Sequence, residues 1–242
     1  MPMELLEPLE HADSAGTVRL KELGLTPEDL DYALRGADAE ARTWSAAAPP
    51  IMPGLARWAK TNELLRLRLL PRGWSQDNPK LMPRTISPDR AHAIVATAGD
   101  AATGIPRANP TTRYAKGAET VKAVQVNVQL AFDFAGLFGW PEPSDFAAPD
   151  SARPGDAMET WLLLYNVTET EIRAELSLAS GISANGFVGA WRERIILPVI
   201  DLSDPDSAGS GPGSAGRDQG KTGRGLPGDA GQERVTVTVE QR

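Results

Sequence analysis

Apolar and polar residues alternate along several segments in the second half of the chain, and this period of two constrains the fold more than any other feature. From residue 124 to residue 132 the even positions are apolar, whereas the odd positions include Gln125, Asn127 and Gln129, and the pattern begins at Lys122. Successive side chains of a strand point to opposite faces. The pattern therefore predicts a half-buried strand of an antiparallel sheet over these residues.

Three later segments also have strand-like patterns. Residues 161–167 form a short apolar run typical of a buried strand, and residues 171–178 alternate again. The pair Asn185-Gly186 is favoured in hairpin turns that need positive φ. It precedes a predicted strand from about residue 187 to residue 200, in which Gly189 is compatible with a bulge. Together these segments predict a β-meander.

The first half of the chain predicts two helices. Thr26 can cap a helix, Pro27 suits its first position, and apolar residues then recur at helical spacing as far as Trp44. A second helix is expected over residues 53–70. Residues 65–69 alternate in a way that would also fit a strand, but leucine and arginine favour a helix.

These elements predict a single α+β domain over residues 1–202. We expect a helical part to about residue 70, a basic loop-rich part over 71–119 built around a short strand at 92–98, and a mainly antiparallel sheet over 120–202. Residues 203–233 contain 9 glycines and 3 prolines, which predicts a long disordered loop. Valines alternate with threonines over 234–242 and predict a terminal strand that returns to the sheet.

The composition excludes several classes of site. The 242 residues include no cysteine, and the two histidines, His11 and His92, are far apart, so we expect no cofactor and no histidine- or thiolate-bound metal. The acidic N-terminus lacks the features of a secretory signal, and no apolar run approaches the roughly 20 residues that span a bilayer. We therefore expect a cytoplasmic protein with no membrane partner. A relaxed phosphate-loop match at 215–222 has neither the strand nor the helix that such a loop needs.

Charge is distributed unevenly along the chain. Residues 53–120 contain 11 of the 25 Lys and Arg but only 5 of the 32 Asp and Glu, so a chain of net charge −7 includes a segment of charge +6. Such a segment can attract phosphates or carboxylates. The alternative is internal neutralisation by the acidic N-terminal part, with Glu and Asp of residues 22–40 lying against Arg57, Arg66 or Arg68.

The most specific candidate site follows the predicted strand at 92–98. Gly99 and Thr103 could present hydrogen-bond donors, and Arg107, Arg113 and Lys116 could add positive charge around one anion. Asp100, and more weakly Asp77, could ligate Mg²⁺ or act as a base. The alternative is a loop in which Asp100 and Thr103 make local turn hydrogen bonds and the cations are solvated.

Two aromatic residues lie among these basic residues. Trp74 and Tyr114 could stack on nucleic-acid bases, although tryptophan more often covers the edge of a core. Glutamates at 171, 175 and 193 are expected on a solvated sheet face, where cross-strand arginines would pair with them. His92 begins an apolar strand, which favours a structural role over that of a general base.

These observations favour an accessory binding protein whose basic loop docks a phosphate-bearing partner, with nucleic acid as the first candidate. One alternative is an enzyme in which Asp100 or Asp77 acts on a small anion held by the three cations. Another is a protein-interaction module whose basic region meets an acidic protein partner.

Overall fold

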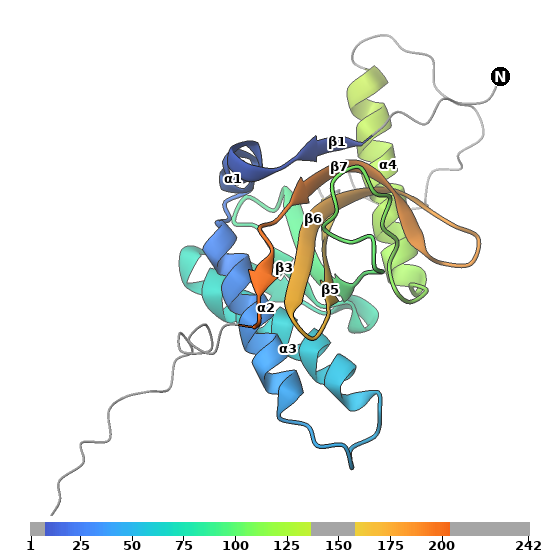
Figure 1. Cartoon of the computed structure of the whole chain (residues 1–242). Coiled ribbons are helices and arrows are strands. Elements are labelled where there is room, and N and C mark those ends of the chain that lie inside the picture. The colour runs from blue at the N-terminus through green and yellow to red at the C-terminus, as the bar shows by residue number, and fades with distance from the viewer. Residues whose placement is uncertain (1–7, 137–157, 204–242) are drawn as a thin grey trace, which may run out of the picture. The chain divides into compact units, whose positions relative to one another are not determined.

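A computed structural model describes residues 8–136 and 158–203 (Figure 1). This part of the chain is α+β, with four α-helices and a mixed sheet of eight strands. The helices are α1 (Asp13–Glu22), α2 (Pro27–Arg42), α3 (Met52–Leu69) and α4 (Ala118–Gly136). The strands are β1 (Leu9–His11), β2 (Ser75–Asp77), β3 (Arg84–Ile86), β4 (His92–Ala98), β5 (Glu159–Val167), β6 (Glu171–Ile182), β7 (Val188–Ile196) and β8 (Ile200–Asp201).

The sheet is mixed, which corrects the expectation of a mainly antiparallel one. Its strand order is β1-β7-β6-β5-β4-β3-β2, and β8 pairs with β6. The predicted meander is present, because β5, β6 and β7 pair antiparallel in sequence order. However, β4 and β5 are parallel, and so are β1 and β7. The parallel pair in the middle of the sheet was not predicted.

The strand predicted over residues 122–132 is wrong, because these residues lie in helix α4. Parallel neighbours such as β4 and β5 need a crossover connection, and α4 belongs to this connection. Val124 and Asn127, three positions apart, are both buried on the face that meets the sheet. The valines at even positions therefore have a strand-like spacing, although the buried face follows the helical one.

Both predicted N-terminal helices are confirmed. Helix α2 begins with a capping box in which the Asp29 N–H donates to Thr26 Oγ1 (3.3 Å) and the Thr26 N–H donates to Asp29 Oδ2 (3.0 Å). Helix α3 runs through residues 65–69, so their alternation does not mark a strand. Helix α1 and the short strands β1, β2 and β3 had no clear sequence signal.

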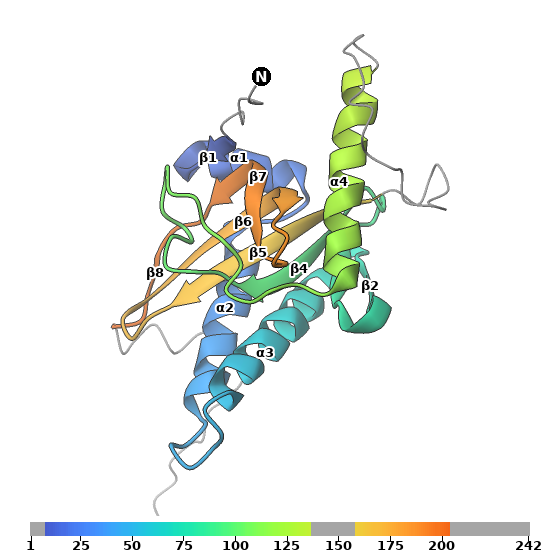
Figure 2. The same ribbon diagram turned by 90° about the vertical axis from the view of Figure 1, so that its right-hand side faces the viewer.

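The central strands are buried on both faces. Trp161, Leu163 and Tyr165 of β5 pack in one core cluster with residues of α2 and α3, whereas Leu162 and Leu164 pack in another with Val124 of α4. Helices therefore cover both faces of this part of the sheet (Figure 2). This explains why residues 161–165 are apolar at every position.

Two of the four cations of α3 are neutralised by α2. Arg57 Nη2 lies 2.7 Å from Asp38 Oδ1, and Arg68 Nε lies 3.0 Å from Asp29 Oδ1. These contacts confirm the expected pairing of acids in residues 22–40 with α3. Arg66 instead donates to the carbonyl oxygen of Asp77 and to Asn78 Oδ1, both at 2.9 Å.

The predicted loop over 203–233 lies outside the described residues except for Ser203. The strand predicted over 234–242 and the motif match at 215–222 lie entirely outside them.

The buried carboxylate of Asp29 leads to a prediction about pH. Burial would raise its pKa, but hydrogen bonds from Arg72, the Thr26 N–H and Arg68 together hold that pKa below its usual value. Because the unfolded-state pKa of aspartate is about 3.9, the resulting stabilisation is present above that pH and is lost as the pH falls through the lower folded-state pKa. We expect Asp29→Ala to lower the free energy of unfolding by about 2 kcal/mol at pH 7, and by much less at pH 3.

Urea denaturation at the two pH values measures this difference. Asp31→Ala is the matched control, because Asp31 lies on the same helix with its side chain 44% exposed and, among the described residues, forms an ion pair with Arg35 alone. It should cost less than about 1 kcal/mol at either pH. Equal destabilisation by Asp29→Ala at pH 3 and pH 7 would contradict the assignment.

Candidate ligand-binding site

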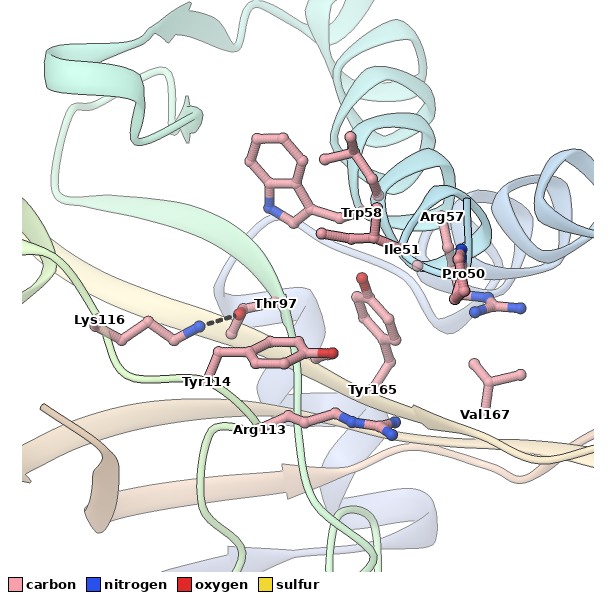
Figure 3. Close-up of a pocket in the computed structure, with 13 residues that line it drawn as sticks. Pro50, Ile51, Arg57, Trp58, Thr97, Arg113, Tyr114, Lys116, Tyr165 and Val167 are labelled. Atoms are coloured by element: carbon pink, nitrogen blue, oxygen red, sulfur yellow. Dashed lines mark hydrogen bonds between the residues drawn. The ribbon is translucent and has the colours of Figure 1, made fainter. Parts of the chain in front are cut away.

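A cavity of about 430 Å³ lies at the carboxyl ends of β4 and β5, beside the first turns of α3 (Figure 3). We call it the α3–β4 pocket. It is lined by Pro50, Ile51, Gly54, Leu55, Arg57, Trp58, Thr97, Ala98, Arg113, Tyr114, Lys116, Tyr165 and Val167. Ligands of sheets with parallel strands often bind outside the carboxyl ends of those strands. The position therefore follows from the parallel pairing of β4 and β5.

Main-chain hydrogen bonds hold the segment 113–116 across the end of β4. The Arg113 N–H donates to the Ala98 carbonyl oxygen (2.9 Å), and the Lys116 N–H donates to the Gly186 carbonyl oxygen (2.7 Å). Gly186 has φ of +81° and belongs to the turn between β6 and β7. The hairpin predicted from Asn185-Gly186 thus also fixes one wall of the pocket.

Lys116 is the most unusual side chain in the pocket. Its Nζ donates to Thr97 Oγ1 at 2.6 Å, and the Thr97 side chain is buried (Figure 3). Within the described residues no carboxylate lies within ion-pair distance of Lys116. Burial lowers the pKa of Lys116 to about 8. Its amine is therefore poised between the charged and the neutral form near physiological pH.

The other polar groups of the pocket differ in burial. Tyr165 is only 4% exposed, and burial raises the pKa of its phenol, so the hydroxyl stays protonated at neutral pH. Tyr114 is 64% exposed. Arg113 is exposed as well, and its guanidinium forms no ion pair with the described part of the chain. Arg57 differs because Asp38 neutralises it.

Three of the predicted site residues come together here, namely Arg113, Tyr114 and Lys116. Asp100 does not line the pocket. Its carboxylate accepts hydrogen bonds from the Ala102 N–H (3.0 Å) and from the N–H and Oγ1 of Thr111 (3.0 and 2.9 Å). The bond from Ala102 is a local turn contact of the kind that the alternative interpretation expects, whereas the bonds from Thr111 connect the turn to a later part of the loop. The described residues include no group of three or more acidic or histidine side chains placed to hold a metal ion.

The remaining loop residues have structural contacts. Thr103 is fully buried, and a Cβ added to Gly99 would lie 2.1 Å from Thr103 Oγ1, so the glycine permits a close packing of the turn. The main-chain N–H of Arg107 donates to both carboxylate oxygens of Glu10 (3.2 and 3.0 Å). All three lie outside the α3–β4 pocket.

Trp74 and Asp77 are also separate from the pocket. Trp74 is 5% exposed and packs edge-on against His92, with ring centroids 5.5 Å apart. A ring so deeply buried does not offer a free face for stacking on a base. Asp77 pairs with Arg84, whose Nε lies 2.8 Å from Asp77 Oδ1. His92 has the structural role expected, because its Nε2 lies 3.1 Å from the Leu23 carbonyl oxygen and burial lowers its pKa.

The expectation that the glutamates of this sheet face are solvated is wrong for Glu175 and Glu193, which are buried. Glu175 is fully buried, and its carboxylate accepts hydrogen bonds from Arg194 Nε (3.0 Å), Ser177 Oγ (2.7 Å) and the Gly104 N–H (2.9 Å). Arg194 also pairs with Glu10. Glu193 is buried and pairs with Arg19, whereas Glu171 is partly exposed and pairs with Arg173. The cause is that the loop after β4 covers this part of the sheet.

Fold and pocket together define an α+β protein with a ligand-sized cavity at the end of two parallel strands. No protein-family model, curated protein or solved structure matches the chain. Among the described residues, no helix is both long and apolar enough to cross a membrane.

Sequence reasoning missed the walls of the pocket. Trp58, Thr97 and Tyr165 lie on elements that were all predicted, but they meet only because α3 packs beside the parallel pair β4 and β5. An alternation of apolar and polar residues does not report which strands are neighbours. The order of strand, loop and helix from β4 to α4 is the available signal, and it is hidden because the alternation over residues 122–132 predicts a strand where α4 lies.

Proposed function

We propose that this protein binds a small organic anion in the α3–β4 pocket, with Arg113 and Lys116 as the anion-binding residues. The observation that carries the proposal is the charge of the lining. Three cationic side chains line the pocket and no Asp or Glu does, and Arg57 is the only one of the three in an ion pair within the described residues. An anion bound here would supply the negative charge that Arg113 and Lys116 lack.

The size and the apolar lining support a small molecule as the ligand. Small-molecule sites typically enclose about 300–1,000 Å³ and combine an apolar wall with a few polar groups. Here Trp58, Ile51 and Val167 provide apolar surface, and Tyr165 and Thr97 provide hydroxyl groups. We therefore expect the ligand to carry a phosphate or carboxylate group on an aromatic or aliphatic body.

Nucleic acid is the second candidate. The exposed ring of Tyr114 lies between the two cations in sequence, and aromatic rings among basic residues are typical of single-strand binders. A phosphate group of a strand would then occupy the same site. The small anion is favoured because Arg57, Arg68, Arg72 and Arg84, which would otherwise extend a basic surface, are paired with carboxylates.

Titration with 8-anilinonaphthalene-1-sulfonate, an aromatic anion, tests the proposal by fluorescence. We expect saturable binding that Arg113→Gln and Lys116→Met each weaken about tenfold, since a hydrogen bond to a charged group contributes about 1.5–3 kcal/mol. Arg90→Gln and Lys21→Met are the matched controls, because both residues are exposed and lie outside the pocket. They should leave the affinity unchanged.

Equal affinities of all four variants would contradict the proposal. Fluorescence anisotropy with a labelled single-stranded DNA at low and moderate salt separates the two candidates. A strand that contacts several phosphates should lose affinity steeply with salt, by a slope of about −0.7 per contact. If the pocket binds only one anionic group, the affinity should fall much less with salt and should depend little on the length of the strand.

A further inference from the structure

Lys116 differs from the other lysines of the described residues in what surrounds its amine. Lys60 pairs with Glu63, and Lys80 and Lys122 both pair with Glu119. The amine of Lys116 instead faces a hydroxyl, Thr97 Oγ1, at 2.6 Å. A hydroxyl accepts a hydrogen bond from the amine without supplying the negative charge that would keep it protonated.

The position of this amine is fixed. Thr97 is the second-last residue of β4, at a position where β4 is paired with Leu164 of β5, so its hydroxyl is held by the middle of the sheet. Lys116 reaches it from the loop, and its main chain is anchored to Gly186. The pocket continues from this point past Tyr114 and Arg113 (Figure 3). An amine held inside a cavity in this way is accessible to a bound ligand and shielded from bulk water.

We propose that Lys116 forms a reversible imine with an aldehyde or ketone group of the bound anion, whose anionic group is held by Arg113. This inference rests on the proposed function, and it narrows the ligand class to small oxo acids or carbonyl-bearing phosphates. A lysine amine in an apolar pocket is the usual nucleophile toward a carbonyl carbon.

The reaction balances without a further reagent. The neutral Nζ lone pair forms a bond to the carbonyl carbon, and the C=O π pair moves to oxygen, which takes a proton. One of the two amine hydrogens supplies that proton, and loss of the resulting hydroxyl together with the second amine hydrogen as one water molecule then leaves a C=N bond. No group is oxidised or reduced, and addition of water reverses the step.

The neutral amine is required for the first bond, and the surroundings of Lys116 provide it. Because burial lowers the pKa of Lys116 to about 8, against about 10.4 for an unperturbed lysine, its neutral fraction at pH 7 is larger by roughly a hundredfold. Lys21 is exposed and serves as the comparison within the same molecule.

The test uses 4-formylbenzoate, an aromatic carboxylate with an aldehyde opposite its anionic group, and sodium cyanoborohydride to reduce any imine to a stable amine. Peptide mapping by mass spectrometry then locates the label among the six lysines of the chain. We expect Lys116 to be labelled at least tenfold faster than Lys21 at pH 7, with a rate that levels off above about pH 8. Labelling in proportion to exposure, with Lys116 no faster than Lys21, would overturn the inference.

A non-carbonyl analogue separates this result from the proposed function. 4-Methylbenzoate has the same carboxylate and a similar shape but forms no imine. Displacement of the fluorescent anion by both benzoates without selective labelling of Lys116 would disprove the imine and leave anion binding intact. If the fluorescent anion itself did not bind and no selective label appeared, both proposals would fail. Because the mapping is done on the wild-type protein, no result depends on the folding of a variant.

Discussion

Replacing Arg194 with alanine is expected to lower the free energy of unfolding by about 3–5 kcal/mol, the cost of breaking a buried ion pair by removing one partner. Arg194 and Glu175 are both fully buried, and they form two hydrogen bonds with each other, at 3.0 and 2.5 Å. Without Arg194, the carboxylate of Glu175 would keep Ser177 and the Gly104 N–H as its partners among the residues that the structure describes. Urea denaturation followed by tryptophan fluorescence measures the loss.

The same substitution should also loosen the loop that leads to the pocket. Arg194 donates to the carbonyl oxygen of Ala108 (2.6 Å), and Glu175 binds the N–H of Gly104, so the pair ties residues 104–108 to the sheet. We expect faster hydrogen exchange in this loop than in β5. The loop that contains Arg113 and Lys116 is thus connected to the core by the ion pair of Arg194 and Glu175, which does not line the pocket.

A neighbouring arginine provides the control for the Arg194 prediction. Arg192 lies two residues earlier on β7 and pairs with Glu159, but both side chains are partly exposed, at 34% and 28%. Arg192→Ala should cost about 1 kcal/mol or less. The double substitution Arg194→Met with Glu175→Leu should recover part of the loss, because it leaves no fully buried charge unpaired, although Glu10 loses its arginine partner. Similar costs for Arg192→Ala and Arg194→Ala would contradict the role of burial.

Sequence reasoning succeeded where the signals are local. The cap at Thr26 and Pro27 and the turn at Asn185-Gly186 each depend on a few adjacent residues, and helix α2 and the hairpin of β6 and β7 follow from them. In each case the neighbours in sequence are the neighbours in space.

Reasoning failed where a property depends on distant residues. The alternation of apolar and polar residues places Glu175 on the outward face of its strand. However, the loop after β4 covers Glu175 and Arg194 neutralises it, and the alternation predicts neither contact. The same holds for the pocket, since Tyr165 joins Lys116 only through the parallel pairing of β4 with β5. Asp100 follows a buried strand, which suggests a ligand of a metal or anion, but its carboxylate accepts hydrogen bonds from Ala102 in its own turn and from Thr111 farther along the loop.

The misassigned segment 122–132 gives the second prediction with a large effect. Asn127 is 2% exposed, and its side chain bridges two strands of the sheet. Its Nδ2 donates to the carbonyl oxygens of Thr160 (2.9 Å) and Ala179 (3.1 Å), and its Oδ1 accepts from the Thr160 N–H (2.8 Å). Asn127→Leu would leave three main-chain groups without this partner. We expect a loss of about 2–4 kcal/mol in the free energy of unfolding, since each buried unsatisfied group costs about 1–3 kcal/mol.

Comparing Gln125→Leu with Asn127→Leu tests the assignment of helix α4 as well as the hydrogen bonds of Asn127. In a strand, Asn127 and Gln125 would share one polar face, and replacing either with leucine would have the same small effect. In helix α4 the two side chains lie about 200° apart around the axis, and Gln125 is exposed whereas Asn127 is buried. Gln125→Leu should therefore change the stability by no more than about 0.5 kcal/mol. Equal effects of the two substitutions in urea denaturation would support the strand and contradict the packing of α4 against β5 and β6.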